Sequence, residues 1–89
     1  METEFSALFR QAREKRGLSQ YQMAELLGVD NSYISKIERG LIPSRKKVVE
    51  ILDLLEVNGP RERLDYLLAA GYVSYEDVEK AAQVSDLAN

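Results

Sequence analysis

Apolar residues recur along most of this chain at the three- and four-residue spacing of amphipathic helices. Phe5, Phe9 and Ala12 make the first such stripe, with polar residues between them. We find no alternating strand pattern and no internal repeat. We therefore predict an all-α fold of five to six short helices, over residues 3–16, 20–27, 31–39 and 45–57, then from 58–60 to 71, and finally 75–84.

Residues 19 to 40 predict two short helices joined by a tight turn. Ser19 can N-cap the first helix, and Gln22 completes a capping box three residues later. Gly28 falls where the end of that helix needs a left-handed backbone, which glycine adopts without steric cost. Asp30 is the expected N-cap of the second helix, and Gly40 is its expected end. This is the helix-turn-helix layout, whose second helix enters the major groove of DNA.

The net charge of −3 is unusual for a protein that binds nucleic acid, but the charges are segregated. Residues 1–47 carry nine Lys and Arg against six Asp and Glu, a balance of +3, whereas residues 48–89 carry three against nine, a balance of −6. Attraction to phosphate is local, because charges are screened within about 10 Å. The basic half contains the helix-turn-helix, so the negative total does not argue against DNA binding.

Most of the residues that metal sites and enzymes require are missing from the chain. It has no cysteine, and therefore no disulfide or thiol nucleophile, and no histidine, the commonest general base near neutral pH. Glu76, Asp77 and Glu79 are better explained as helix-start and solvent-facing charges than as an acid–base pair. No apolar run is long enough to span a membrane. We expect a cytoplasmic protein that is not an enzyme, with no metal and no cofactor.

The predicted helix 31–39 presents a compact polar face. At about 100° per residue, six side chains fall opposite its two isoleucines or at the flanks of that side: Asn31, Ser32, Tyr33, Ser35, Lys36 and Arg39. Lys and Arg suit guanine edges or phosphates, Asn suits adenine, and Ser suits either. Gln20 is well placed for a phosphate at the positive end of the preceding helix. The alternative is an ordinary solvated face, with Tyr33 covering the seam to the next helix.

Glu38 falls about 40° from Ile34 on the same projection and should face inward. An inward carboxylate needs a partner, because a lone buried charge costs several kcal/mol. Arg13 on the first helix is the partner that we expect. The alternative is that Glu38 is only a partly exposed residue of the last helical turn.

The segment FRQAREKRGLSQYQMAELLGVDNSYISKIERG closely resembles the helix-turn-helix of the Xre, Cro and lambda-repressor family. In that family the segment commonly reads GLSQxxLAxxLGVSxxxISxxExG, followed by a short loop with proline. Met23 and Asp30 replace the usual leucine and the usual serine or threonine cap, both conservatively. The resemblance covers about residues 5–57, and its matching positions are Gly17, Leu18, Ser19, Gln20, Ala24, Leu27, Gly28, Val29, Ile34, Ser35, Glu38, Gly40 and Pro43.

The resemblance implies a function and a set of site residues. Family members bind operator DNA, usually as two-fold dimers, and act as repressors or activators. By resemblance, Gln20 clamps a phosphate. The polar face of helix 31–39 also meets DNA, with Asn31, Ser32 and Lys36 reading bases and Tyr33, Ser35 and Arg39 at base or backbone positions. The resemblance implies the ion pair between Arg13 and Glu38 as well.

The second half of the chain has two possible roles. We assign residues 1–73 to the helix-turn-helix domain and residues 74–89 to a helical extension. Its apolar residues either close the core or form a two-fold interface: Leu64, Leu67, Leu68, Tyr72, Val73, Tyr75 and Val78. We expect a repressor-like, homodimeric regulator that binds double-stranded DNA. The alternative is a module that binds a protein partner, such as an antitoxin or a phage or plasmid factor.

Overall fold

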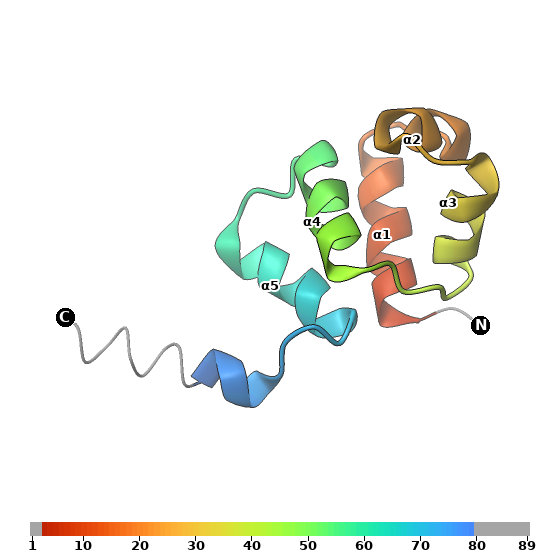
Figure 1. The fold of residues 1–89 in the computed structure, drawn as a ribbon. Helices are drawn as coiled ribbons and strands as arrows, with labels where there is room; N and C mark the ends of the chain where they lie inside the picture. Colours follow the sequence, from red (N-terminus) through yellow and green to blue (C-terminus); the bar gives the residue numbers. More distant parts are fainter. Residues whose placement is uncertain (1–2, 80–89) are drawn as a thin grey trace.

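The computed structural model describes residues 3–79, in which five helices are followed by a further helical segment at 75–79 (Figure 1). The helices are α1 (Glu4–Lys15), α2 (Gln20–Leu27), α3 (Asn31–Glu38), α4 (Arg45–Leu54) and α5 (Pro60–Ala69). These 77 residues contain no strand, and the prediction of an all-α fold is confirmed. The part of the predicted last helix from residue 80 onward lies outside the described residues. No helix in the described range is long and apolar enough to cross a membrane.

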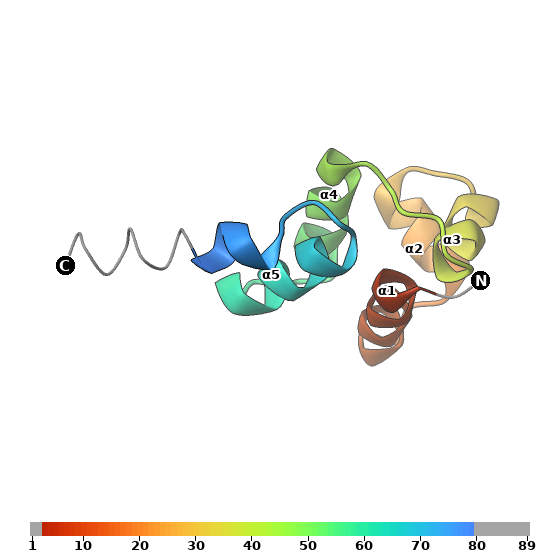
Figure 2. The same cartoon turned by 90° about the horizontal axis from the view of Figure 1, so that it is seen from below.

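Helix α1 lies between the α2–α3 pair and the α4–α5 pair (Figures 1 and 2). Its apolar stripe points into the core, where Phe5 and Phe9 are fully buried and their rings stack at 6.4 Å between centroids. The other apolar side chains with no exposed surface lie on α2, α3 and α4. The hydrophobic periodicity therefore identifies the buried face of α1, α3 and α4, and that of α2 except at Leu26, which was expected on the apolar side and is 52% exposed.

Most helix starts use the capping chemistry that the sequence indicates. Ser19 Oγ accepts the N–H of Gln22 at 3.0 Å, and Gln22 Oε1 accepts the N–H of Ser19 at 2.8 Å. Ser74 and Asp77 form the same reciprocal pair ahead of the segment 75–79. Asp30 does occupy the N-cap position of α3, but its side chain makes no capping hydrogen bond. The prediction for Asp30 was right in position and wrong in its chemistry.

Helix α4 ends three residues earlier than the apolar spacing predicts. Glu56 has a left-handed backbone with a φ of 56°, and the N–H of Val57 then donates back to the carbonyl of Leu52 at 2.9 Å. This is the Schellman pattern, in which glycine is the usual left-handed residue. Arg16 of α1 lies against the turn, with its Nη1 2.6 Å from the Glu56 carboxylate. The sequence did not predict this helix end, because Glu56 occupies the left-handed position at which a glycine would normally mark the end of a helix.

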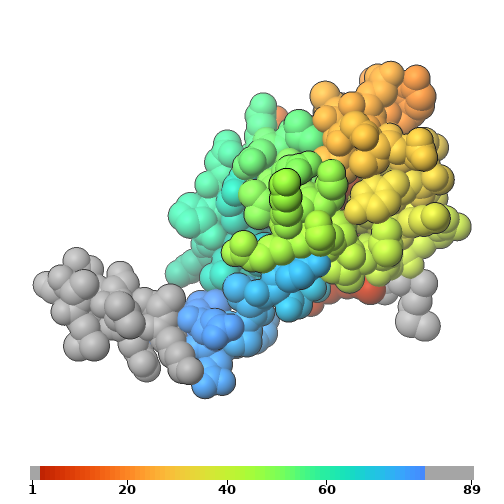
Figure 3. Space-filling model, in the orientation of Figure 1, coloured from red at the N-terminus to blue at the C-terminus, as the bar shows by residue number. Residues whose placement is uncertain are grey.

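Part of the second half closes the core. The Tyr66 side chain on α5 is buried, and its ring meets Phe5 edge-on at 6.4 Å between centroids. Its hydroxyl donates to the carbonyl of Leu8 at 3.4 Å. Tyr72 packs against the buried cluster, and its hydroxyl donates to the carbonyl of Pro43 in the loop between α3 and α4. The residues that follow α5 consequently lie along this loop on the molecular surface (Figure 3).

Five of the seven apolar residues predicted either to close the core or to form an interface keep exposed surface without packing against the buried cluster. Tyr75 is 75% exposed. Four more are partly exposed and are not among the side chains that pack against the buried cluster: Leu64, Leu68, Val73 and Val78. We call these five residues the C-terminal apolar strip. Core closure therefore accounts for Leu67 and Tyr72, and the strip remains for another role.

Candidate nucleic-acid interface

The outer face of α3 is the best-defined polar surface on the basic half of the molecule. Ile34 and Ile37 are fully buried and fix the rotation of the helix about its axis. The opposite side is thereby turned outward. Of the six side chains that this face was predicted to present to DNA, four are exposed (Asn31, Ser32, Lys36 and Arg39), whereas Tyr33 and Ser35 are partly buried.

A shallow hollow joins this face to the turn after α2. It is lined by Gly28, Val29, Asp30, Ser32, Tyr33 and Lys36. Tyr33 packs against the buried cluster, so its ring forms a fixed wall of the hollow. Gly28 has a φ of 73°, which lets the chain reverse tightly enough to place the start of α3 here. Three of the predicted contact residues (Ser32, Tyr33 and Lys36) are therefore brought together.

Asp30, which the sequence predicts as the N-cap of α3, is a further candidate for contact with DNA. Since its carboxylate is exposed and makes no capping bond, it is available at the rim of this hollow. A carboxylate there would accept from the amino group of cytosine and repel a phosphate. Its use as a cap was the natural interpretation, because Asp before a helix normally caps it.

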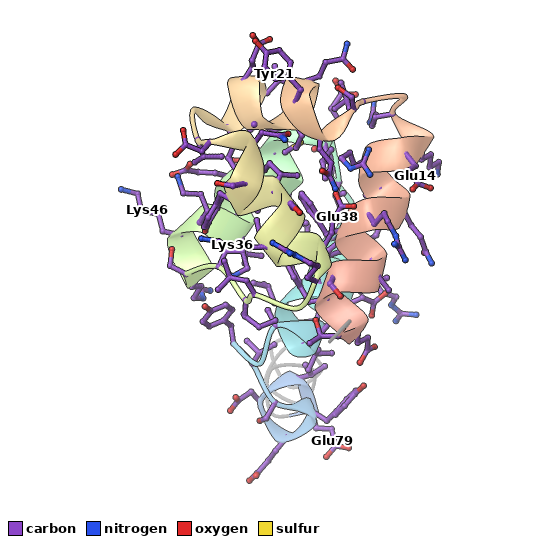
Figure 4. The ribbon with its side chains drawn as sticks, turned by 90° about the vertical axis from the view of Figure 1, so that its right-hand side faces the viewer. Glu14, Tyr21, Lys36, Glu38, Lys46 and Glu79 are labelled. Carbon is purple, nitrogen blue, oxygen red and sulfur yellow. The ribbon has the colours of Figure 1, made fainter. Side chains whose placement is uncertain are left out.

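Glu38 lies between α3 and α1 (Figure 4), and the two side chains expected to pair are in contact. Arg13 Nε donates to Glu38 Oε2 at 2.7 Å and Nη2 donates to Oε1 at 3.1 Å, a two-pronged geometry. Arg13 Nη1 donates to the carbonyl of Leu18 at 2.6 Å. The hydrogen bond with Glu38 raises the pKa of Arg13, against the lowering effect of burial. The pair fixes the base of α3 against α1.

Gln20, expected at a phosphate, is the first residue of α2 and is partly buried at the seam with α3. Its Nε2 donates to Glu38 Oε1 at 3.4 Å. An amide nitrogen carries two N–H groups, so one such bond leaves the second N–H for another acceptor. The contact with Glu38 was not foreseen, because a helix projection does not show which side chains meet across two helices.

The first turn of α4 adds a basic cluster that was not among the predicted site residues. Ser44 caps this helix through the N–H of Lys47 at 3.2 Å, and Arg45 and Lys46 are exposed. Lys46 projects to the same side of the molecule as Lys36 (Figure 4). A helix start has unpaired N–H groups as well, so it suits a phosphate. The sequence feature that could have predicted this cluster is the run of three basic residues directly after the N-cap Ser44.

Acidic residues gather at the other end of the described chain. Glu79 lies far from α3 (Figure 4), and Glu76 and Asp77 are exposed beside it. These acidic residues are therefore separated in space from the basic side chains around α3. Two other glutamates of the acidic half pair with residues of the basic half: Glu50 with Lys47, and Glu56 with Arg16. No group of three or more His, Cys, Asp or Glu side chains within residues 3–79 could hold a metal ion.

Comparisons with known proteins agree with this geometry. A family model described as helix-turn-helix matches residues 9–60, which is more than half of the chain. A comparison with curated proteins gave no match. The matched range includes α2, α3 and the basic start of α4, and it ends at the first residue of α5.

Proposed function

Because the chain belongs to the helix-turn-helix family of the Xre and lambda-repressor type, a family of DNA-binding regulators, we propose that it is a sequence-specific repressor that places α3 in the major groove of double-stranded DNA. The observation that carries the proposal is the outer face of α3. Two fully buried isoleucines hold this helix, and four of its predicted contact side chains are exposed on the other side.

The proposal gives the surrounding groups distinct roles. Asn31, Ser32 and Lys36 read base edges, and Asp30 adds an acceptor at the rim. Gln20 donates its second amide N–H to a phosphate. Tyr33, Ser35 and Arg39 lie at base or backbone positions, and Arg45 and Lys46 meet the backbone across the groove. Phosphate contacts of this kind set the register of α3, and the contacts with base edges supply the specificity.

Selection of bound duplexes from a random DNA pool tests this function, followed by affinity measurements on the enriched sequence. We expect Lys36→Ala to weaken binding about 5- to 150-fold, corresponding to about 1–3 kcal/mol for a base contact. The matched control is Lys15→Ala, which removes the same charge from the exposed end of α1. The proposal fails if no sequence is enriched at modest salt, or if the two variants bind equally well.

Dimerisation is the second part of the proposal, and the C-terminal apolar strip supports it. Two copies of one helix-turn-helix can read two half-sites about 34 Å apart, which doubles the base contacts. We expect Tyr75→Ser to shift a concentration-dependent dimer toward the monomer in size-exclusion chromatography with light scattering. A single-chain mass at every concentration would contradict the dimer. The strip would then be left for a different protein, as an antitoxin-like role requires.

A further inference from the structure

Tyr72 lies beyond the range that the family model matches, yet its side chain reaches the loop that follows α3. Gly71 has a φ of 83°, and the N–H of Tyr72 donates to the carbonyl of Leu67 at 2.9 Å. In this left-handed helix end, the residue after the glycine is folded back onto its own helix. The backbone of Tyr72 is therefore fixed by α5.

The hydroxyl of Tyr72 donates to the carbonyl oxygen of Pro43. Pro43 is buried, and its carbonyl belongs to the peptide unit that leads into Ser44, the N-cap of α4. Since a peptide unit is planar, a group that holds its oxygen also orients its nitrogen end. The hydrogen bond consequently helps to set the direction in which α4 begins.

The start of α4 bears the exposed charge of Arg45 and Lys46. The loop of residues 39–44 is the covalent link between this helix and α3. Its conformation, together with the packing of α4 on the core through Val48, Ile51 and Leu52, sets how far Lys46 stands from the side chains of α3. Attraction to a phosphate falls off with distance and is screened by salt, so this spacing matters for a protein that must meet bases and backbone together.

We propose that Tyr72 is a positioning residue for DNA binding: its hydroxyl holds the Pro43–Ser44 peptide unit so that Lys46 meets the DNA backbone while α3 occupies the groove. This inference rests on the proposed function. It gives the segment after residue 60 a part in recognition, through a contact that joins Tyr72, outside the matched family range, to Pro43 inside it. The competing explanation is that the hydroxyl only stabilises the fold.

Tyr66 provides a matched control for that explanation. Tyr66→Phe and Tyr72→Phe both keep a packed ring and both remove one hydroxyl that donates to a backbone carbonyl. The acceptor of Tyr66 is Leu8 on α1, away from the proposed interface. The two variants should therefore lose similar stability, whereas only one of them should change how DNA is bound.

The experiment measures the dissociation constant for the enriched duplex over a range of salt concentrations. The proteins are the wild type, the two Tyr→Phe variants, Lys46→Ala, and the double variant Tyr72→Phe/Lys46→Ala. We expect Tyr72→Phe to weaken binding several-fold and to reduce the slope of log K against log salt by up to about 0.9, the value for one phosphate contact. Tyr66→Phe should match the wild type, and the double variant should bind no more weakly than Lys46→Ala.

Two results would overturn the inference while the proposed function stands. One is a Tyr72→Phe protein with the affinity and salt slope of Tyr66→Phe. The other is a double variant whose loss is the product of the two single losses, which would show that Tyr72 does not act through Lys46. If the wild type binds no duplex, or if Lys36→Ala binds as well as Lys15→Ala, the proposed function itself fails and this inference falls with it.

Discussion

Replacing Glu38 with alanine should be among the most destabilising single changes in this protein. The Glu38 side chain is only 6% exposed, and its carboxylate accepts two hydrogen bonds from Arg13. The Arg13 side chain is itself only 11% exposed, and without Glu38 its guanidinium keeps the hydrogen bond to the Leu18 carbonyl but loses its buried counter-charge. Removing one member of a buried pair typically costs about 3–5 kcal/mol, because the other charge stays buried and uncompensated.

That cost is large against the whole stability of such a domain. At about 0.05–0.15 kcal/mol per residue, an 89-residue chain is stable by about 4–13 kcal/mol. Each kcal/mol shifts the melting temperature of a domain this size by about 4–8 °C. We therefore expect Glu38→Ala to lower the Tm by at least about 12 °C, measured by circular dichroism on heating.

Glu14 supplies the control, since it contacts the same arginine from the surface. Its carboxylate lies 3.9 Å from Arg13 Nη2, and its side chain is 62% exposed. Exposed pairs contribute little, so Glu14→Ala should change stability by less than about 1 kcal/mol. An arginine guanidinium stays charged at neutral and mildly alkaline pH even without Glu38, so the difference between the variants should persist there. A Glu38→Ala protein that melts within about 2 °C of Glu14→Ala would refute the reasoning, because that gap is worth less than about 1 kcal/mol.

Three further outcomes follow from the local geometry. Burial, together with the nearby carboxylates, raises the pKa of Tyr66 above its ordinary 10.0. The stability that comes from its neutral form is therefore complete below pH 10.0 and is lost as the pH rises through the folded pKa. Ultraviolet titration should show a late-ionising tyrosine that Tyr66→Phe lacks. Ser19→Ala should lower the free energy of unfolding in urea by about 0.5–2 kcal/mol, because it removes a capping hydrogen bond. Asp30→Ala removes no such bond and should lower it by less than about 0.5 kcal/mol. Equal losses would contradict the conclusion that Ser19 caps its helix and Asp30 does not. Gly28→Ala should cost about 1–2 kcal/mol from its φ of 73° alone, because no atom lies within 4 Å of the added methyl group, and an unchanged urea midpoint would count against this.

Local patterns in the sequence predicted the parts of the fold that depend on near neighbours. The capping pairs at Ser19 and Ser74 each join residues three apart, and both are present. The inward rotation of Glu38 followed from its angle to Ile34 on one helix. These features could be read from the sequence because helix geometry fixes the distances within a few turns.

The features that were missed depend on which helices meet. The hydrogen bond from Tyr72 to Pro43 spans 29 residues, and the contact of Gln20 with Glu38 spans 18. No periodicity encodes such distances. The end of α4 was missed for a different reason, since Glu56 adopts a backbone conformation that usually signals glycine. In the proposed interface, the structure turns Asn31, Ser32 and Lys36 of α3 outward, but the base that each one would read depends on DNA shape as well.

The packing of Tyr66 on the first helix also sets an order of events during synthesis. The Leu8 carbonyl that accepts its hydroxyl precedes it by 58 residues, so at about 5–20 residues per second the ribosome needs roughly 3–12 s to supply this partner. Helices α2 and α3 are both made within that interval and can pair with each other in the meantime. Until then the edge of Phe5 lacks the aromatic partner that it has in the folded protein. The α2–α3 pair can therefore form before the packing site of α1 is complete.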